Sequence, residues 1–273
     1  MDLKELQTNW NTFGRKDPLW AIMTWPDKKG NQWQLREFFE FGEKEIKGVL
    51  DHLKLLGVSV QGGRALDFGC GVGRLTQALA QHFDEAIGVD IAPSMINLAN
   101  QYNRHGSRCR YCLNEVDNLE LFPSEKFDFI YTNIVLQHMV SVYSKSYIRE
   151  FMRVLKPRGV LVFQLPSERT ETGKLRTQDS LPAETLSSPD TSMGLKQTVK
   201  QYLPASLLNW YVNLRYPKEP VMEMHCVERR EVEQLLAESG AHVLHVVEDN
   251  SSGPGFRSFR YTVTKSIIGE RHH

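Results

Sequence analysis

A glycine-rich turn between an apolar run and an amphipathic segment constrains this sequence more than any other feature. The apolar residues before the turn are Ala65, Leu66 and Phe68, and the turn spans residues 69–73 with glycine at its first, third and fifth positions. Glycine has no Cβ, so the backbone can reverse tightly there and a ligand can lie against it. Apolar residues at helical spacing follow from Thr76 onward. This stretch therefore predicts a strand, a tight turn and the start of a helix.

A second apolar run, residues 86–89, ends in Asp90. A strand, a glycine turn, a helix and a second strand tipped by an acid are typical of a nucleotide-binding half-unit, in which the acid accepts hydrogen bonds from ribose hydroxyls. The spacing G-x-G-x-G differs from the dinucleotide pattern G-x-G-x-x-G, and Arg74 stands where that pattern needs glycine. Asp67, two residues before the turn, would repel a pyrophosphate and suits a ligand that carries an ammonium group.

Asp67, the three glycines and Asp90 together resemble motif I and the following acid of the class I S-adenosylmethionine-dependent methyltransferases. A second similarity lies at residues 153–160, Arg-Val-Leu-Lys-Pro-Arg-Gly-Val, which resemble the R-x-L-K-P-G-G turn of this family, a structural rather than catalytic signature. The resemblance covers residues 64–265 apart from an insertion. It implies that the protein is a methyltransferase that uses S-adenosylmethionine and releases S-adenosylhomocysteine.

The resemblance and the apolar segments imply an α/β fold: a Rossmann-like, seven-stranded, mostly parallel sheet with an antiparallel last strand and helices on both faces. Residues 1–60, rich in tryptophan and phenylalanine, predict an N-terminal helical cap, and residues 61–273 the methyltransferase domain. An insertion at about 167–226, after the fifth strand, carries a helical pattern at 195–216. Long insertions in compact domains are often functional, so we expect a substrate lid there. The alternative is a helix simply packed on the domain.

The expected cofactor contacts come from the resemblance and from the chemistry of each side chain. Ile91 and Met95 would hold the adenine ring between them. In the family, an acid after the third strand binds the adenine amino group and the next backbone N–H binds a ring nitrogen. Glu115 and Val116 fit these positions best, with Asp117 as a competing candidate. The predicted cofactor-binding residues are Asp67, Gly69, Cys70, Gly71, Gly73, Arg74, Asp90, Ile91, Met95, Glu115, Val116, Asn133 and Gln137.

The end of the fourth strand supplies the candidates nearest the chemistry. Asn133 and Gln137 would hold the methionine end of the cofactor through a backbone carbonyl or amide. His138 is the leading general-base candidate, because imidazole titrates near neutral pH and this turn should point at the cofactor. Alternatively, it caps the next helix or bonds the backbone. Glu223 and His225 are weaker candidates for binding or deprotonating substrate. Substrate contacts are expected from Trp20, Trp25 and Tyr211.

The charge balance argues against nucleic acid or an anionic membrane as the main partner. Lys+Arg and Asp+Glu each total 33, so the formal net charge is zero and no global basic field is expected. No apolar run approaches the length of a membrane span. Four cysteines are too few for a disulfide framework, and the pair Cys109 and Cys112 lacks further metal ligands nearby. We expect no metal, reduced thiols and a cytoplasmic protein.

We therefore expect methyl transfer to an oxygen or nitrogen of a small, partly apolar metabolite, by a monomer or a homodimer. Residues 133–136 after the fourth strand lack the Asn/Asp-Pro-Pro-Tyr/Phe motif of base and amide-nitrogen methylation. Two alternatives stay open. One is a non-catalytic regulatory or interaction protein that binds S-adenosylmethionine on the same fold. The other is a different reaction of the cofactor, such as aminopropyl transfer.

Overall fold

The computed structural model describes residues 1–60, 62–171 and 219–265. Most of the predicted insertion, including its helical pattern at 195–216 and Tyr211, lies outside these residues. In the described part of the chain, seven strands form one sheet in the order β3-β2-β1-β4-β5-β7-β6. The strands are β1 (Arg64–Phe68), β2 (Glu85–Asp90), β3 (Cys109–Leu113), β4 (Phe127–Thr132), β5 (Leu155–Arg169), β6 (Ala241–Asp249) and β7 (Phe256–Lys265).

The direction of the strands confirms the predicted fold class. β1 to β5 run parallel to one another, and β7 runs antiparallel to both β5 and β6. The order of the strands reverses between β1 and β4. Open α/β sheets bind ligands at such a switch point, outside the carboxyl ends of the strands. The glycine turn, which follows β1, lies at this point.

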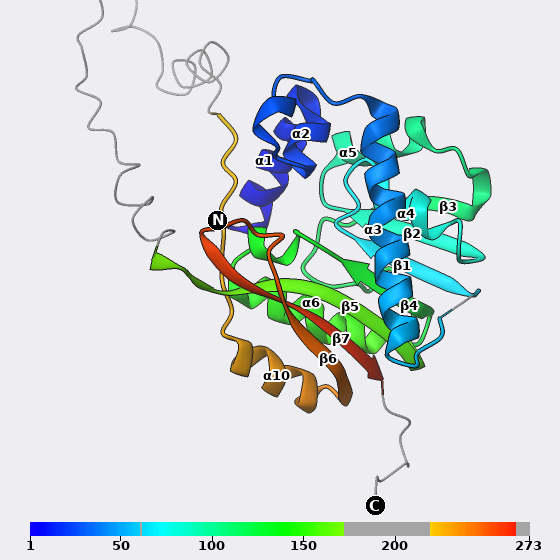
Figure 1. Cartoon of the computed structure of the whole chain (residues 1–273). Helices are drawn as coiled ribbons and strands as arrows, with labels where there is room; N and C mark the ends of the chain where they lie inside the picture. The colour runs from blue at the N-terminus through cyan, green and yellow to red at the C-terminus, as the bar shows by residue number, and fades with distance from the viewer. Residues whose placement is uncertain (61, 172–218, 266–273) are drawn as a thin grey trace, which may run out of the picture.

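Helices cover both faces of the sheet (Figure 1). On one face α3 and α4 pack against Ala65 and Phe129, and on the other α6 and α10 pack against Leu66 and Ile130. The alternation is expected because successive side chains of a strand point to opposite faces. The helices are α1 (Leu3–Lys16), α2 (Pro18–Ile22), α3 (Leu35–Leu55), α4 (Arg74–Leu79), α5 (Pro93–Tyr102), α6 (Ser141–Val154) and α10 (Arg229–Glu238), with short 3₁₀ turns η1 (Pro26–Lys28), η2 (Gly106–Arg108) and η3 (Leu136–His138).

The first two helices lie over the carboxyl ends of the strands (Figure 1). α1 begins with a capping box made by Asp2 and Glu5, which satisfies two N–H groups of its first turn. Further along, the backbone N–H of Ser94 in α5 donates to the Asn11 side chain at 3.0 Å, and the Ser94 hydroxyl donates to the Asn11 carbonyl at 2.9 Å. α1 is thus tied to α5 beside the switch point.

The N-terminal segments are helical, as predicted for residues 1–60, and prolines divide them. α2 and η1 each begin at a proline, Pro18 and Pro26, which is favourable because proline lacks the N–H that a first turn leaves unused. α3 is the longest helix of the predicted helical cap. Aromatic side chains of this region, including Trp33 and Phe38, gather in a cluster that reaches α5.

β5 differs from the prediction at its start. The resemblance at residues 153–160 implies a turn before the fifth strand, whereas a continuous strand is formed from Leu155. The register with β4 shifts between Phe127 and Phe129, and Arg158 adopts a left-handed φ of 63°. The predicted turn is therefore a bulge inside the strand. Ladder hydrogen bonds on both sides of the bulge keep the strand continuous.

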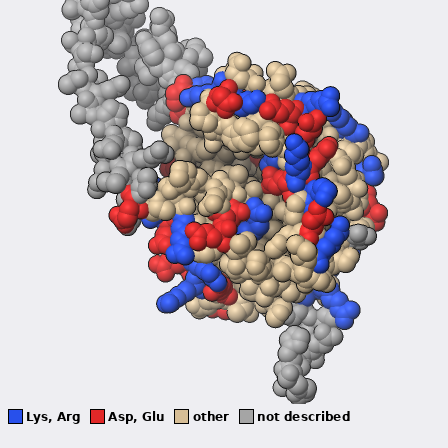
Figure 2. Space-filling model, viewed as in Figure 1, with Lys and Arg blue, Asp and Glu red and all other residues tan. Residues whose placement is uncertain are grey.

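The surface carries charges of both signs without segregation on the face seen in Figure 2, in line with the net charge of zero. Within the described ranges, no helix is long and apolar enough to cross a bilayer. All four cysteines are free thiols, and Cys70 and Cys109 are buried.

Candidate functional site

A cavity of about 370 Å³ lies at the carboxyl ends of β1, β2 and β4, beneath α1 and α2. Its walls join the glycine turn to α1, to the segment after α2, and to the segments that contain Met222 and Ser252. The predicted cofactor-binding residues in this wall are Gly69, Cys70, Gly71, Arg74, Asp90, Ile91, Met95, Asn133 and Gln137. The predicted residues outside it are Asp67, Gly73, Glu115 and Val116.

The three glycines of the turn adopt left-handed φ angles of 75°, 51° and 83°, which other residues adopt only with strain. They also allow close packing. A Cβ on Gly71 would lie 2.5 Å from Cδ1 of Ile22 in α2, and a Cβ on Gly73 would collide with the hydroxyl of Tyr111 in β3. The turn therefore needs glycine both for its backbone and for the approach of its neighbours.

Asp90 ends β2 and faces the turn from the neighbouring strand. Its Oδ2 accepts the backbone N–H of Gly71 and its Oδ1 accepts that of Ala92, both at 2.8 Å. Burial raises the pKa of Asp90, and these N–H donors oppose the rise. Each carboxylate oxygen has two acceptor sites. Both oxygens can therefore still accept a ligand hydroxyl, as the predicted ribose contact requires.

Asp67 lies behind the wall, on the face of β1 that α3 and α4 cover. Its Oδ2 accepts the hydroxyl of Thr76 in α4 at 2.6 Å. Burial raises the pKa of Asp67 to about 7, although the Thr76 hydrogen bond and the charge of Arg74 oppose this. Because Asp67 does not line the cavity, its contact with an ammonium group stays a prediction.

A charged cluster at the end of β4 includes Glu45 of α3, which the sequence does not single out. Its Oε2 lies 2.8 Å from Nη1 of Arg74, and its Oε1 accepts the Tyr131 hydroxyl at 2.9 Å and Nδ2 of Asn133 at 2.8 Å. Burial acts to raise the pKa of Glu45, but Arg74 and these hydrogen bonds lower it more, so the carboxylate is ionised. Glu45 does not line the cavity itself, but its two partners Arg74 and Asn133 do.

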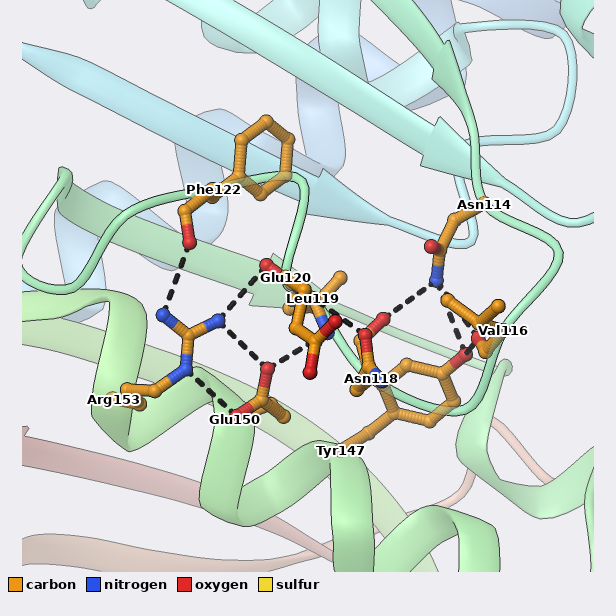
Figure 3. A network of polar contacts seen from close by, with 9 residues as sticks. All are labelled: Asn114, Val116, Asn118, Leu119, Glu120, Phe122, Tyr147, Glu150 and Arg153. Atoms are coloured by element: carbon orange, nitrogen blue, oxygen red, sulfur yellow. Dashed lines mark hydrogen bonds and ion pairs between the residues drawn. The ribbon is translucent and has the colours of Figure 1, made fainter.

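The turn after β3 brings a different residue to the cavity from the two predicted. Glu115 and Val116 are exposed, whereas Asn114 is buried and lines the cavity. Nδ2 of Asn114 donates to the carbonyl oxygens of Val116 at 3.0 Å and Asn118 at 2.9 Å, and the Tyr147 hydroxyl also donates to Val116 (Figure 3). The adenine contacts of Glu115 and Val116 stay predictions.

Arg153 of α6 holds the rest of this turn in place (Figure 3). It donates to the carbonyl oxygens of Phe122 at 3.0 Å and Leu119 at 2.9 Å, and forms an ion pair with Glu150 at 2.7 Å. Glu150 in turn accepts the backbone N–H of Leu119 at 2.7 Å. Arg153 is the first residue of the predicted structural signature, and its planar donors fix the turn against α6.

His138 lies in η3 at the cavity wall and is buried, with 4% of its surface exposed. Its Nδ1 lies 2.8 Å from the carbonyl oxygen of Glu223, which can only accept, so Nδ1 carries the proton. Its Nε2 lies 3.3 Å from Nε2 of Gln137, and its ring meets Trp10 edge-on with 5.2 Å between centroids. Burial lowers the pKa of His138 to about 4. The imidazole is therefore neutral, with its lone pair on Nε2.

The two weaker catalytic candidates lie outside the wall. Oε2 of Glu223 and Nε2 of His225 are 3.0 Å apart and bond each other. The flanking methionines, Met222 and Met224, line the cavity instead. The structure thus brings the main chain of Glu223 to His138, but not its carboxylate to the cavity.

Of the aromatic residues predicted to contact substrate, one lines the cavity and one does not. Trp25 lines the cavity, whereas Trp20 lies outside it and donates its indole N–H to the Trp25 carbonyl at 3.1 Å. Tyr211 lies outside the described residues. Over the ranges 1–60, 62–171 and 219–265, no group of three His, Cys, Asp or Glu side chains could hold a metal.

Several wall residues carry no local signal in the sequence, because distant segments bring them together. They include Trp10, Phe68, Tyr147, Ser252 and Phe256. Asn114 is different, because it lies directly before Glu115 and Val116, the residues predicted to contact adenine. Glu45 had no such signal, because β1, β2 and β3 all lie between α3 and β4 in the sequence.

Residues 66–163 match the protein family described as "Methyltransferase domain". This range contains residues of the glycine turn, Asp90, Asn133 and His138, which all line the cavity. Residues 66–163 are similar to a methyltransferase domain. The order and direction of the strands are those expected of the class I S-adenosylmethionine-dependent methyltransferases.

Curated relatives resemble the methyltransferase domain rather than the whole chain. Phosphoethanolamine N-methyltransferase 3 of Arabidopsis thaliana is 27% identical over 106 residues, which cover 38% of this chain and 22% of that protein. Ubiquinone biosynthesis O-methyltransferase of Bordetella avium is 29% identical over 115 residues, 42% of this chain and 47% of that protein. The chain thus matches less than half the length of these relatives.

A likeness in fold extends over nearly the whole chain. The crystal structure of magnesium protoporphyrin IX methyltransferase from Synechocystis PCC 6803, with bound S-adenosylhomocysteine, aligns with a TM-score of 0.60 and 16% identity. The alignment covers 97% of this chain and 100% of that one. At this identity the likeness concerns the fold alone.

Proposed function

We propose that the protein is an S-adenosylmethionine-dependent methyltransferase that acts on a small molecule. The observation that carries the proposal is that two kinds of chemistry line one cavity. The glycine turn and the carboxylate of Asp90 belong to its wall, and so does His138, whose Nε2 is unprotonated, together with apolar side chains. A methyltransferase needs this pairing, because the reacting groups of cofactor and acceptor must meet in line.

The residues present fit the cofactor. Asp90 has acceptor sites left for ribose hydroxyls, and the glycine turn leaves space that a Cβ would fill. Ile91 and Met95 would flank the adenine ring, while Arg74 and Asn133 would hold the methionine end. When bound, S-adenosylmethionine supplies a methyl group already activated by its sulfonium. The chain then has to bind and orient both partners and receive a proton from the acceptor.

His138 would receive that proton. With Nδ1 committed to the Glu223 carbonyl, Nε2 is the basic atom. A hydroxyl or amine that binds against Nε2 would be oriented by its hydrogen bond and would pass its proton there as the methyl group is transferred. The low pKa of His138 keeps this nitrogen unprotonated at neutral pH.

The acceptor end of the cavity favours an uncharged apolar molecule. We assign to the acceptor the apolar wall residues that lie outside the glycine turn, among them Leu6, Trp10, Met139, Met222, Met224 and Phe256. Among the described lining residues the charged side chains are Arg74 and Asp90, both at the cofactor end. A phosphorylated acceptor would meet no cation there. The resemblance to an O-methyltransferase of ubiquinone biosynthesis supports a hydroxylated apolar acceptor, although an uncharged amine would also fit.

The direct test is a search for turnover. The protein is incubated with methyl-labelled S-adenosylmethionine and pools of apolar phenols, alcohols and amines, and S-adenosylhomocysteine is measured with and without each pool. Formation of S-adenosylhomocysteine that depends on a pool, and that the substitution Asp90→Ala abolishes, supports the proposed methyltransferase activity. Binding of S-adenosylhomocysteine without turnover on any pool would favour the non-catalytic alternative, and turnover of decarboxylated S-adenosylmethionine would favour aminopropyl transfer. A cytoplasmic location, a monomer or homodimer, and the absence of a nucleic acid or membrane partner stay predictions.

A further inference from the structure

α3 approaches the start of α4 unusually closely. A Cβ on Gly42 of α3 would lie 2.7 Å from Cγ of Arg74 and 2.8 Å from its carbonyl oxygen. The ring of Phe38, one turn earlier, lies 5.8 Å from Cζ of Arg74. Glu45 follows Gly42 by three residues and so projects from the same face of the helix. This packing brings a carboxylate from the N-terminal part of the chain to the end of β4.

Glu45 determines how the Asn133 amide is turned. An ionised carboxylate only accepts hydrogen bonds, so Asn133 must present Nδ2 to it, at 2.8 Å. The amide oxygen must therefore face away from Glu45. That oxygen, Oδ1, is buried and has no hydrogen-bond partner among the described residues, although Asn133 lines the cavity. A buried acceptor without a partner is uncommon in folded proteins and indicates that a donor is missing.

We propose that Glu45 is a positioning residue that turns the Asn133 oxygen toward the bound cofactor, where it accepts the α-ammonium group of the methionine end. Arg74, held by Glu45 through Nη1, keeps its other donors for the carboxylate of the same amino-acid group. Glu45 itself touches no part of the cofactor. This inference rests on the proposed function, because it concerns the cofactor of that reaction.

The test uses two ligands that differ only in the amino group: S-adenosylhomocysteine and its analogue in which hydrogen replaces the α-amino group. Titration calorimetry gives both dissociation constants. We expect the wild-type protein to prefer the amino form by at least ~10-fold, since a charge-assisted hydrogen bond is at stake. In Glu45→Gln, the new amide can donate to Asn133 Oδ1, so Asn133 can turn its NH₂ into the cavity. The preference should then fall below ~3-fold.

The ratio of the two constants isolates the amino group. Weakening of the ion pair with Arg74 would affect both ligands alike, because both retain the carboxylate. Glu43→Gln is the matched control: Glu43 lies on the same helix, is exposed, and accepts Nε2 of Gln81 at 3.0 Å. It should keep the wild-type ratio. If Glu45→Gln does not fold, Asn133→Ala removes the oxygen directly and should lower the ratio equally.

The outcomes separate this inference from the proposed function. A wild-type protein that binds S-adenosylhomocysteine with the expected preference, and a Glu45→Gln variant that keeps it, would overturn the role of Glu45 alone. A wild-type protein that binds neither ligand would overturn the proposed function and this inference with it. A preference that is present in the wild type and lost in Glu45→Gln, but not in Glu43→Gln, supports both.

Discussion

The imidazole of His138 donates from Nδ1 to the carbonyl oxygen of Glu223, 2.8 Å away. This single bond selects the tautomer in which Nε2 is basic. It also joins η3 to the segment that precedes α10, so the orientation of the ring depends on a part of the chain 85 residues away. Removal of the imidazole and changes in pH both test this arrangement.

His138→Ala should reduce turnover at least ~100-fold, the usual scale for loss of a general base. The dissociation constant of S-adenosylhomocysteine should change less than ~3-fold, because His138 lies toward the acceptor end. His225→Ala is the control, since His225 is close in sequence to Glu223 yet lies outside the cavity wall. Comparable losses in both variants would contradict the assigned role.

The pH dependence of turnover should lack the acid limb of an ordinary histidine. Burial lowers the pKa of His138 to about 4, so the ring stays unprotonated as the pH falls from 8 to about 5. We expect kcat/KM to lose activity through this group only below that range. Nitrogen NMR of labelled histidine should show a neutral ring protonated at Nδ1 at pH 6. An imidazolium at that pH would refute the assignment.

Gly71→Ala should be more harmful than the same change at Gly106. The two glycines have similar left-handed φ angles, 51° and 57°, so the backbone strain is about equal. Only at Gly71 would the new Cβ meet Ile22, while Gly106 faces open space. We expect an additional loss of about 1–3 kcal/mol in the free energy of unfolding at Gly71, and binding of S-adenosylhomocysteine at least ~10-fold weaker. Urea unfolding and calorimetry measure the two effects.

Asp67→Asn should change how stability depends on pH. Burial raises the pKa of Asp67 from 3.8 to about 7, so the folded protein holds a proton that the unfolded chain releases between these values. Wild-type stability from this group is therefore lost as the pH rises from about 4 to about 7. The variant should gain roughly 1–3 kcal/mol relative to wild type between pH 5 and pH 8. Urea unfolding of the wild type and of Asp67→Asn at pH 5 and pH 8 measures this gain, with Glu43→Gln as the control. If the buried proton is absent, the difference in stability between variant and wild type should be the same at both pH values.

Arg153→Lys should loosen the turn that carries Asn114. Lysine cannot reach both carbonyl oxygens and Glu150 at once, because its three donors radiate from one nitrogen. We expect a loss of about 1–2 kcal/mol in stability, and a KM for S-adenosylmethionine that rises while kcat is kept. Arg149→Lys is the control, since Arg149 is an exposed residue of the same helix. Equal effects at both positions would argue against a role for Arg153 in holding the turn.

The fold could be predicted from the sequence because its evidence is local. The glycine turn, Asp90 and the apolar runs each lie within a few residues, and they carry the family resemblance that implies the seven-stranded sheet that is observed. The one error in the sheet, the start of β5, concerns a bulge whose existence depends on ladder bonds to the flanking strands. A local pattern of Lys, Pro, Arg and Gly does not distinguish a bulge from a turn.

The cavity wall could be predicted from the sequence mainly around the glycine turn and Asp90, with His138 and Trp25 besides. Gly71 and Asp90 are specified by backbone chemistry, which the spacing of the residues reveals. Glu45 and Trp10 act through contacts between elements, and no periodicity within a helix says which strand end it will meet. At the turn after β3, an offset of a single residue separates buried Asn114 from exposed Glu115, and this is finer than a pattern can resolve.

Leu3 of α1 and Phe256 at the start of β7 line the same cavity. The first helix and the last strand of the described chain must both dock before the cavity is complete, so most of the chain is ordered before a ligand can bind. The loops closed by these contacts are long, and assembly of the site should therefore be among the late events of folding. A ligand of this cavity would stabilise the tertiary assembly as a whole, and its binding would report that folding is finished.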